Sequence, residues 1–329
     1  MPLFFCIKFA SVEKIYLLCT RKKYINHNNN KKRMKNIKIF VMSMVAALMV
    51  SCGTTNTVPI TGRKQKLMVS DGEMLSLSTQ QYQEFMKTAK LSTNATNTAM
   101  VKRVGTNLAN AVVNFLNTNG MQNDVQNYQW TFNLVADNQA NAWCMPGGLI
   151  VVYEGILPIT QDEASLAIVL GHEIAHAVAR HSAEQMSQQI KQQYGVQAAG
   201  ALAGVLGAGS NTISLGQAAL NSGLSLFNLK YSRNHESEAD HLGLIFAAMA
   251  GYDPSVAVKF WERMSEASGN KSTAEFLSDH PSDATRIKNI QGWLPEAQQY
   301  YKPKTTTTTT KKTTTKKTTT KKTTTSKKK

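Results

Sequence analysis

The chain has 329 residues and a formal net charge of +16 at pH 7, enough length for one large domain or two small ones. The charge is concentrated at the two ends: residues 1–51 carry ten Lys or Arg and one acidic residue, and residues 302–329 carry eleven Lys and no acidic residue. Subtracting these +9 and +11 from +16 leaves −4 for residues 52–301. This balance excludes a basic nucleic-acid-binding core and indicates an ordinary globular body with no nucleic-acid partner.

Residues 34–52 have the pattern of a secretory signal. A basic start at Met34-Lys35 is followed by an apolar run over residues 39–50 and by Ser51-Cys52. The run is too short for a membrane span, which needs about 20 apolar residues. Residues 49–52 (Met-Val-Ser-Cys) resemble a bacterial lipobox, which predicts lipidation of Cys52 and attachment to a membrane. A plain signal peptide with an incidental cysteine is the alternative.

The surroundings of this signal predict its boundaries and its destination. Residues 1–33 precede it, and because a signal normally begins at the N-terminus, we expect the true start to be Met34. Gly53 follows the cysteine without an acidic retention residue. By analogy with other bacterial lipoproteins, we expect a lipid anchor in the outer membrane, facing the periplasm. The expected organisation is an upstream extension plus signal peptide (1–51), a polar tether (52–70), one folded domain (71–301) and a tail (302–329).

The tail beyond Pro303 consists of Thr and Lys apart from Ser326. Without apolar residues it cannot bury a core, so we expect it to be disordered. It is either a solubilising tail or an electrostatic contact with lipid head groups, lipopolysaccharide or other anionic envelope polymers. Nucleic acid is disfavoured because the tail has no aromatic residues for stacking on bases.

The sequence of residues 71–301 predicts a mostly helical α+β domain. Helical spacing extends from Asp71 to about Lys90 and over residues 100–115, ending near Asn119-Gly120. Alternation over residues 128–134 predicts a half-buried strand, and residues 149–153 predict another that could present an edge to an extended peptide. Cys144 is expected to be a small buried hydrophobic residue and not a reactive thiol.

His172-Glu173-Ile174-Ala175-His176 is a metal-binding pattern within a helical segment. Histidines four residues apart lie on one helix face, so His172 and His176 can bind the same ion. Glu173 lies beside the open coordination position and can take a proton from a metal-bound water. The spacing therefore indicates hydrolytic chemistry.

Thr160 to Glu163 has the pattern of a capping box that begins this helix. We expect the helix to continue through His181 to about Gln192. In an uninterrupted helix His181 lies about 140° round from His176, which excludes it from the same metal site and favours a structural role. The Gly- and Ala-rich residues 199–216 fit either a mobile hairpin beside the site or close helix packing.

A second helix, expected to start near Ser232, can complete the site. Glu236 and Asp240 are four residues apart and share a face. This suits Glu236 as the third metal ligand and Asp240 as the hydrogen-bond partner of a ligand imidazole, whose tautomer it would fix. Two His, one Glu and an open position form a hydrolytic zinc arrangement.

These motifs together resemble the HtpX/Oma/CAAX-endopeptidase family of gluzincin metallopeptidases, above all its bacterial lipoprotein and periplasmic members of the LoiP, YcaL and BepA type. The resemblance covers roughly Thr61 to Leu294. The segments that carry it are His-Glu-Ile-Ala-His (172–176), Ser-Arg-x-x-Glu-x-Glu-Ala-Asp (232–240), Asn-Ala (141–142) with Pro-Gly-Gly (146–148), Gly-Tyr-Asp-Pro (251–254), and Asp-His-Pro (279–281) with Arg286.

The resemblance implies a zincin-like domain with a small β-sheet and one Zn²⁺ per chain, bound by His172, His176 and Glu236. It also implies that His280 lies at the active site, where it would stabilise the developing oxyanion or occupy the open metal position. HtpX and the CAAX endopeptidases have multiple membrane spans that this chain lacks, so their intramembrane substrates are not carried over.

The function expected from the sequence is that of a zinc-dependent metalloendopeptidase, lipid-anchored through Cys52. Its catalytic residues would be Glu173 as general base and acid, and His280. By family analogy its substrates would be misfolded or misassembled envelope proteins. The alternatives are a periplasmic chaperone or assembly factor with a vestigial zinc site, and a surface adhesin that uses the tail.

Overall fold

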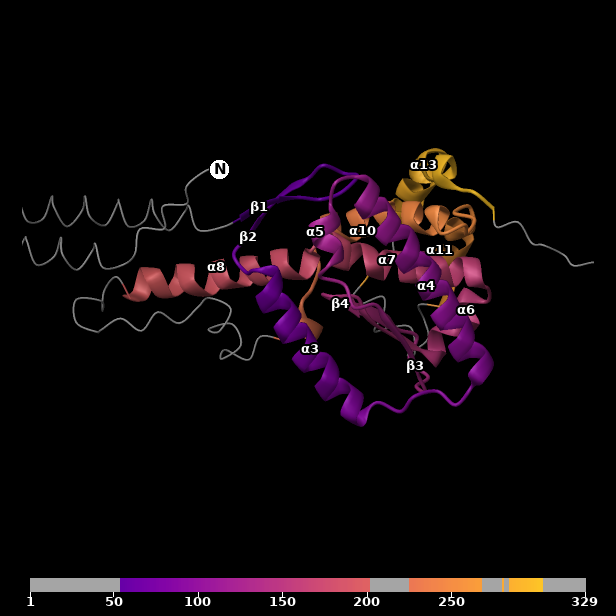
Figure 1. Cartoon of the computed structure of the whole chain (residues 1–329), viewed down its shortest axis with the longest axis horizontal. Coiled ribbons are helices and arrows are strands. Elements are labelled where there is room, and N and C mark those ends of the chain that lie inside the picture. Colours follow the sequence, from indigo (N-terminus) through magenta and orange to yellow (C-terminus); the bar gives the residue numbers. More distant parts are fainter. Residues whose placement is uncertain (1–53, 202–224, 268–279, 281–283, 304–329) are drawn as a thin grey trace, which may run out of the picture. The chain divides into compact units, whose positions relative to one another are not determined.

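The computed structural model describes residues 54–201, 225–267, 280 and 284–303 (Figure 1). The chain divides into two compact units, Met1–Thr55 and Asn56–Lys329, and the architecture below is that of the second. The predicted signal, Cys52, the tail from residue 304 and most of the Gly- and Ala-rich stretch lie outside the described residues. Within those residues, no helix is both long and apolar enough to cross a membrane.

The helices and strands form a mostly helical α+β domain, as the sequence predicts. In chain order they are β1 (Thr54–Thr57), β2 (Lys64–Leu67), α3 (Asp71–Thr88), α4 (Ala95–Thr118), α5 (Gln122–Val125), β3 (Thr131–Val135), β4 (Ala142–Met145), β5 (Leu149–Tyr153), η1 (Glu154–Ile156), α6 (Leu157–Thr160), α7 (Glu163–Val178), α8 (His181–Ala201), η2 (Leu226–Asn228), α10 (Arg233–Met249), α11 (Val256–Glu266) and α13 (Ala284–Tyr300).

A three-stranded sheet of order β3-β5-β4 lies beside the predicted metal helix. β5 pairs in parallel with β3 and antiparallel with β4. Residues 149–153, expected to present an edge, are therefore the central strand. The edge nearest α7 belongs to β4, a four-residue strand that its own sequence does not reveal.

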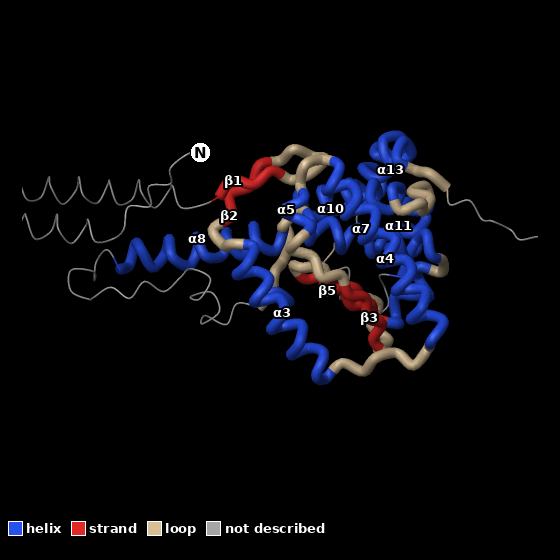
Figure 2. Tube along the Cα trace, viewed as in Figure 1, coloured by secondary structure: helices blue, strands red, loops and turns tan. Residues whose placement is uncertain are grey.

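The two faces of the sheet pack against different helices, because side chains alternate along each strand. Ile150 and Val152 join the large core shared with α4 and α7, whereas Val151 and Tyr153 pack against α3. Figure 2 shows the strands between α3 and α4. Cys144 is buried in the large core, which confirms its prediction as a small hydrophobic residue.

Two helices begin at the N-cap residues that the sequence predicts, and a third begins at a different residue. α3 begins after Ser70, which forms a capping box with Glu73, and α10 begins after Ser232, as expected. The start of the metal helix α7 was predicted wrongly. Asp162, not Thr160, is its N-cap and accepts a hydrogen bond from the Ser165 amide. Thr160 instead ends α6.

The predicted continuous helix through His181 is also wrong. α7 ends at Val178, and Arg180 adopts a left-handed backbone with φ of 54° before α8 begins at His181. The Arg180 side chain forms ion pairs with Asp71 at 3.0 Å and Asp124 at 2.9 Å. These contacts offset the strain that a left-handed conformation imposes on a residue with a Cβ.

Residues 56–70, expected to be a polar tether, pack onto the domain. Val58, Leu67 and Val69 are buried, and Met68 donates its backbone N–H to the Ser187 hydroxyl. The buried Gln65 side chain donates to the carbonyl oxygen of Ala179 at 2.6 Å. The apolar alternation in this segment is too short to be distinguished from a linker by pattern alone.

α7 and α10 cross at a pair of glycines. A Cβ placed on Gly171 would lie 2.6 Å from the carbonyl oxygen of Gly243, and one on Gly243 would lie 2.6 Å from the amide nitrogen of His172. The two backbones are therefore in direct contact, one residue before His172. α7 and α10 also lie side by side in Figure 1.

Candidate metal centre

The crossing of α7 and α10 brings together three of the predicted ligands, and a fourth side chain joins them. Nitrogen or oxygen atoms of His172, His176, Glu236 and His280 all lie within 4.8 Å of one another. The Nε2 atoms of His172 and His176 are 3.1 Å apart, and each lies 3.4 Å from a Glu236 oxygen. All four residues are buried.

His280 lies inside this cluster although it is distant in sequence. Its Nδ1 is 3.0 Å from Glu236 Oε2 and 3.1 Å from His172 Nε2. Arg286 of α13 donates to the His280 carbonyl oxygen at 3.1 Å. The His280 imidazole thus occupies the position of a further ligand.

Asp240 holds His172 from the opposite side. His172 Nδ1 donates to Asp240 Oδ1 at 2.9 Å, which leaves the Nε2 lone pair directed into the cluster. The same carboxylate oxygen accepts from Arg286 Nη2 at 2.6 Å, and the guanidinium carbon lies 3.4 Å from the centre of the Trp261 ring. The orientation of His172 therefore depends on a buried Asp–Arg pair.

The charges around the cluster favour a cation. Burial lowers the pKa of His172, but hydrogen bonds to Asp240 and Glu236 outweigh it and raise this pKa to about 9. Burial keeps the pKa of His176 well below its usual value. Burial opposes ionisation of Glu236, yet the neighbouring imidazoles hold its pKa well below the usual range. The centre therefore combines an ionised carboxylate with imidazole nitrogens, and both kinds of group can bind a cation.

Glu173 has the placement expected of a proton acceptor. Its Oε1 atom is buried and lacks a hydrogen-bond partner among the described residues, and it lies 3.6 Å from His280 Nε2. Burial raises the pKa of Glu173. A buried oxygen without a partner beside three N and O donors fits a zinc site with a coordinated water.

A second chain of contacts leads away from His176. His176 Nδ1 lies 3.0 Å from His181 Nδ1, and His181 Nε2 bonds Glu238 Oε2 at 2.9 Å. The Tyr231 ring stacks on His176 with centroids 4.2 Å apart. His181 lies outside the group of candidate ligands, in agreement with the expectation from sequence, but it touches one of them.

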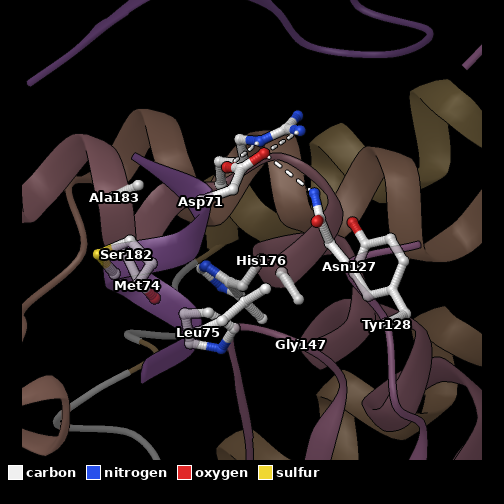
Figure 3. Close-up of a pocket in the computed structure, with 12 residues that line it drawn as sticks. Asp71, Met74, Leu75, Asn127, Tyr128, Gly147, His176, Ser182 and Ala183 are labelled. Atoms are coloured by element: carbon white, nitrogen blue, oxygen red, sulfur yellow. Dashed lines mark hydrogen bonds and ion pairs between the residues drawn. The ribbon is translucent and has the colours of Figure 1, made fainter. Parts of the chain in front are cut away.

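His176 also lines a pocket (Figure 3). Its walls come from the first turns of α3, the loop before β3, the β4–β5 turn and the α7–α8 junction. At its rim Asp71 accepts hydrogen bonds from Asn127 and Arg180, both at 3.0 Å. The lining residues are Asp71, Met74, Leu75, Asn127, Tyr128, Pro146, Gly147, His176, Ala177, Arg180, Ser182 and Ala183.

Sequence reasoning placed His172, Glu173, His176, Glu236, Asp240 and His280, and the structure brings all six together. It expected a structural role for His181, linked neither His181 nor Glu238 to a metal ligand, and named Arg286 only as part of the family resemblance. For Arg286 the signal was its place beyond Asp-His-Pro (279–281) among the segments that carry the family resemblance. For His181 the expected continuous helix pointed the ring elsewhere. Cys52 lies outside the described residues.

A sequence model of peptidase family M48 matches residues 95–294, more than half of the chain. The chain belongs to peptidase family M48. This membership confirms the resemblance inferred from the motifs, and the matched residues contain every described residue of the candidate centre. An M48 fold is also consistent with the mostly helical α+β architecture.

Several M48 relatives are metallopeptidases by name. The mitochondrial metalloendopeptidase OMA1 of Schizosaccharomyces pombe is 37% identical over 171 residues, 52% of this chain and 48% of the relative. The OMA1 of Danio rerio is 34% identical over 249 residues, 73% of this chain and 50% of the relative. The metalloprotease LoiP of Escherichia coli is 27% identical over 263 residues, 78% of this chain and 96% of the relative. The chain thus spans about half the length of these two OMA1 proteins.

Proposed function

We propose that this chain is a zinc-dependent endopeptidase of family M48. The observation that carries the proposal is the convergence of His172, His176 and Glu236, with a Glu173 carboxylate oxygen beside them that has no hydrogen-bond partner among the described residues. Family membership and the relatives named as metalloendopeptidases support it.

His172 and His176 would hold the metal through Nε2, and Glu236 through its carboxylate. Zinc in such a site polarises a carbonyl group and lowers the pKa of coordinated water toward ~7. Glu173 accepts a proton from the attacking water and delivers it to the leaving amine. Because burial raises its pKa, Glu173 is a stronger base than an exposed carboxylate.

Two features beside the centre suit an extended peptide. The outer edge of β4 has no partner strand among the described residues, and β4 packs against α7. An unpaired edge can accept main-chain hydrogen bonds from a substrate strand. The pocket next to His176 has apolar walls from Met74, Leu75 and Tyr128, so it would accept an apolar side chain near the scissile bond.

The location and the substrates form a further part of the proposal. The signal-like run over residues 34–52 supports lipid attachment at Cys52, in the outer membrane and facing the periplasm. Unfolded or misassembled envelope proteins would be the substrates there. Metabolic labelling with a palmitate analogue should modify the wild type and not Cys52→Ser. Equal labelling of the two would remove the anchor from the proposal.

The central experiment measures zinc content together with casein cleavage for the wild type and Glu173→Gln. We expect about one zinc per chain in both and cleavage only by the wild type, with a loss of ~10²–10⁴-fold in the variant. Equal cleavage by the two proteins would refute the role of Glu173. If neither protein cleaves unfolded substrates while both suppress aggregation, the protein is a chaperone with a vestigial site.

A further inference from the structure

We propose that His181 and Glu238 are positioning residues for the metal ligand His176: the Glu238 carboxylate fixes the tautomer of His181, and His181 in turn orients the His176 imidazole toward the metal. The inference rests on the proposed zinc site. The His181 imidazole would accept the Nδ1 hydrogen of His176, as the Asp240 carboxylate accepts the Nδ1 hydrogen of the other ligand, His172.

The geometry forms an unbroken path between α7, α8 and α10. Nδ1 of His176 lies 3.0 Å from Nδ1 of His181, and Nε2 of His181 lies 2.9 Å from a Glu238 oxygen. The three side chains are buried, and His181 is fully so. The left-handed turn at Arg180 produces this contact, because an uninterrupted helix would point His181 about 140° away from His176.

The two ends of the path determine where its protons lie. A carboxylate can only accept, so the hydrogen between Glu238 and His181 belongs to Nε2 of His181. A neutral imidazole protonated at Nε2 has an acceptor at Nδ1, which must receive the hydrogen from Nδ1 of His176. His176 then presents the lone pair of Nε2 to the cluster, as a metal ligand requires. The Glu238 carboxylate and metal binding through His176 Nε2 therefore require the same tautomers: His181 protonated at Nε2 and His176 protonated at Nδ1.

Glu238 is held in place by residues near the N-terminus of the domain. Thr61 donates its hydroxyl to Oε1 at 2.5 Å, and Arg63 Nε donates to Oε2 at 2.8 Å. Arg63 also forms a double hydrogen bond with Glu184, at 2.9 and 2.8 Å. Both donors belong to residues 56–70, so the packing of this segment onto the domain helps to fix the position of the Glu238 carboxylate.

Two substitutions at His181 separate positioning from packing. His181→Asn removes much of the ring but keeps an acceptor oxygen close to the place of Nδ1. His181→Leu keeps most of the volume and removes the acceptor. A positioning role predicts that Asn is tolerated and Leu is not, whereas a packing role predicts the reverse order.

The measurement is the zinc dissociation constant of the full chain, by competition with a chromophoric chelator. We expect His181→Leu to weaken zinc binding by ~10–100-fold and His181→Asn to stay within about threefold of the wild type. His241→Ala is the matched control, since His241 also bonds a glutamate, Glu296 at 2.7 Å, and stacks on Trp293, but forms no hydrogen bond or ring contact with a candidate ligand among the described residues. It should bind zinc like the wild type.

A second pair of variants serves if His181→Leu does not fold. Glu238→Ala and Glu184→Ala each remove one carboxylate partner of Arg63, and only Glu238 touches His181. Glu238→Ala should weaken zinc binding by about tenfold and Glu184→Ala should not.

Zinc binding by His181→Leu that equals the wild type, or binding by His181→Asn as weak as by Leu, would overturn the inference and leave the proposed function intact. Equal effects of the two glutamate variants would overturn it as well. A wild-type chain that binds no zinc would overturn both the inference and the proposed function.

Discussion

Gly171 and Gly243 face each other at the crossing of α7 and α10, where a Cβ on Gly171 would lie 2.6 Å from the Gly243 carbonyl oxygen. Both atoms that would collide are fixed to backbone, so neither can turn away. The crossing sets the distance between the helix that carries His172 and His176 and the helix that carries Glu236. The two glycines therefore allow the close approach of the two helices that carry the candidate ligands.

We expect Gly171→Ala to push the two helices apart and to cost about 1–3 kcal/mol in the free energy of unfolding, as overpacking does. Zinc content should fall with it, because the ligands on α7 and α10 would separate. Urea unfolding and metal analysis measure both effects. Gly72→Ala in α3 is the control, since a Cβ there meets nothing within 4 Å. Equal stability of the two variants would contradict the close crossing.

His280→Ala should raise casein cleavage at saturating zinc. Nδ1 of His280 lies 3.1 Å from His172 Nε2 and 3.0 Å from Glu236 Oε2, so the imidazole occupies space among the ligand atoms that water and substrate need. Steady-state cleavage rates of the variant and the wild type decide the matter. A decrease of ~10²-fold or more would instead assign His280 to stabilisation of the oxyanion.

Glu184 predicts a pH dependence of stability. Burial alone would raise its pKa, but the hydrogen bonds from Arg63 lower it below the usual value of 4.5. A carboxyl whose pKa is lower in the folded state stabilises the protein above its unfolded pKa, and this stabilisation is lost as the pH falls through the folded pKa. Glu184→Gln should remove on the order of 1 kcal/mol at pH 7 and progressively less below pH 4.5.

Urea unfolding between pH 7 and pH 3 tests this dependence. Glu84→Gln is the matched control, because Glu84 pairs with Lys87 at 2.6 Å on the surface, where both side chains are more than 60% exposed. Its effect should be close to zero at every pH. A Glu184→Gln difference that is the same at pH 7 and pH 3 would show that the ion pair with Arg63 is not its source.

The left-handed residue Arg180 allows a comparison of two substitutions. Arg180→Ala and Arg180→Gly both remove the ion pairs with Asp71 and Asp124. Only glycine adopts a φ of 54° without strain, so the Gly variant should be more stable than the Ala variant by about 1 kcal/mol. Thermal unfolding of the two proteins measures the difference. A more stable Ala variant would mean that α7 continues into α8 without the turn.

Local patterns predicted the elements that short-range interactions determine. α3 and α10 begin at serine caps that their sequences display, and His172 with His176 share a face by helical geometry alone. At the start of α7, Thr160 and Asp162 are both acceptable caps; in the structure Thr160 is the last residue of α6 and Asp162 caps α7.

Contacts between distant segments explain what was missed. Ala179, Arg180 and His181 are compatible with a helix, and the turn there accompanies ion pairs to Asp71 and Asp124. β4 has four residues and no clear alternation, so its pairing with β5 alone defines it. Arg286 reaches the centre from α13 through Asp240, a contact that no spacing in the sequence announces.

Because the helix is interrupted at Arg180, the contact between His176 and His181 depends on the number of residues between them and not on helical periodicity. Inserting or deleting one residue between Ala177 and His181 would leave all candidate ligands of the metal intact. It would nevertheless move the His181 ring away from His176 Nδ1, now 3.0 Å distant. A homologue with such a length change would need another hydrogen-bond acceptor for His176 Nδ1. A homologue that keeps the spacing between the two histidines would be expected to position its metal ligand in the same way, even where the rest of its sequence differs.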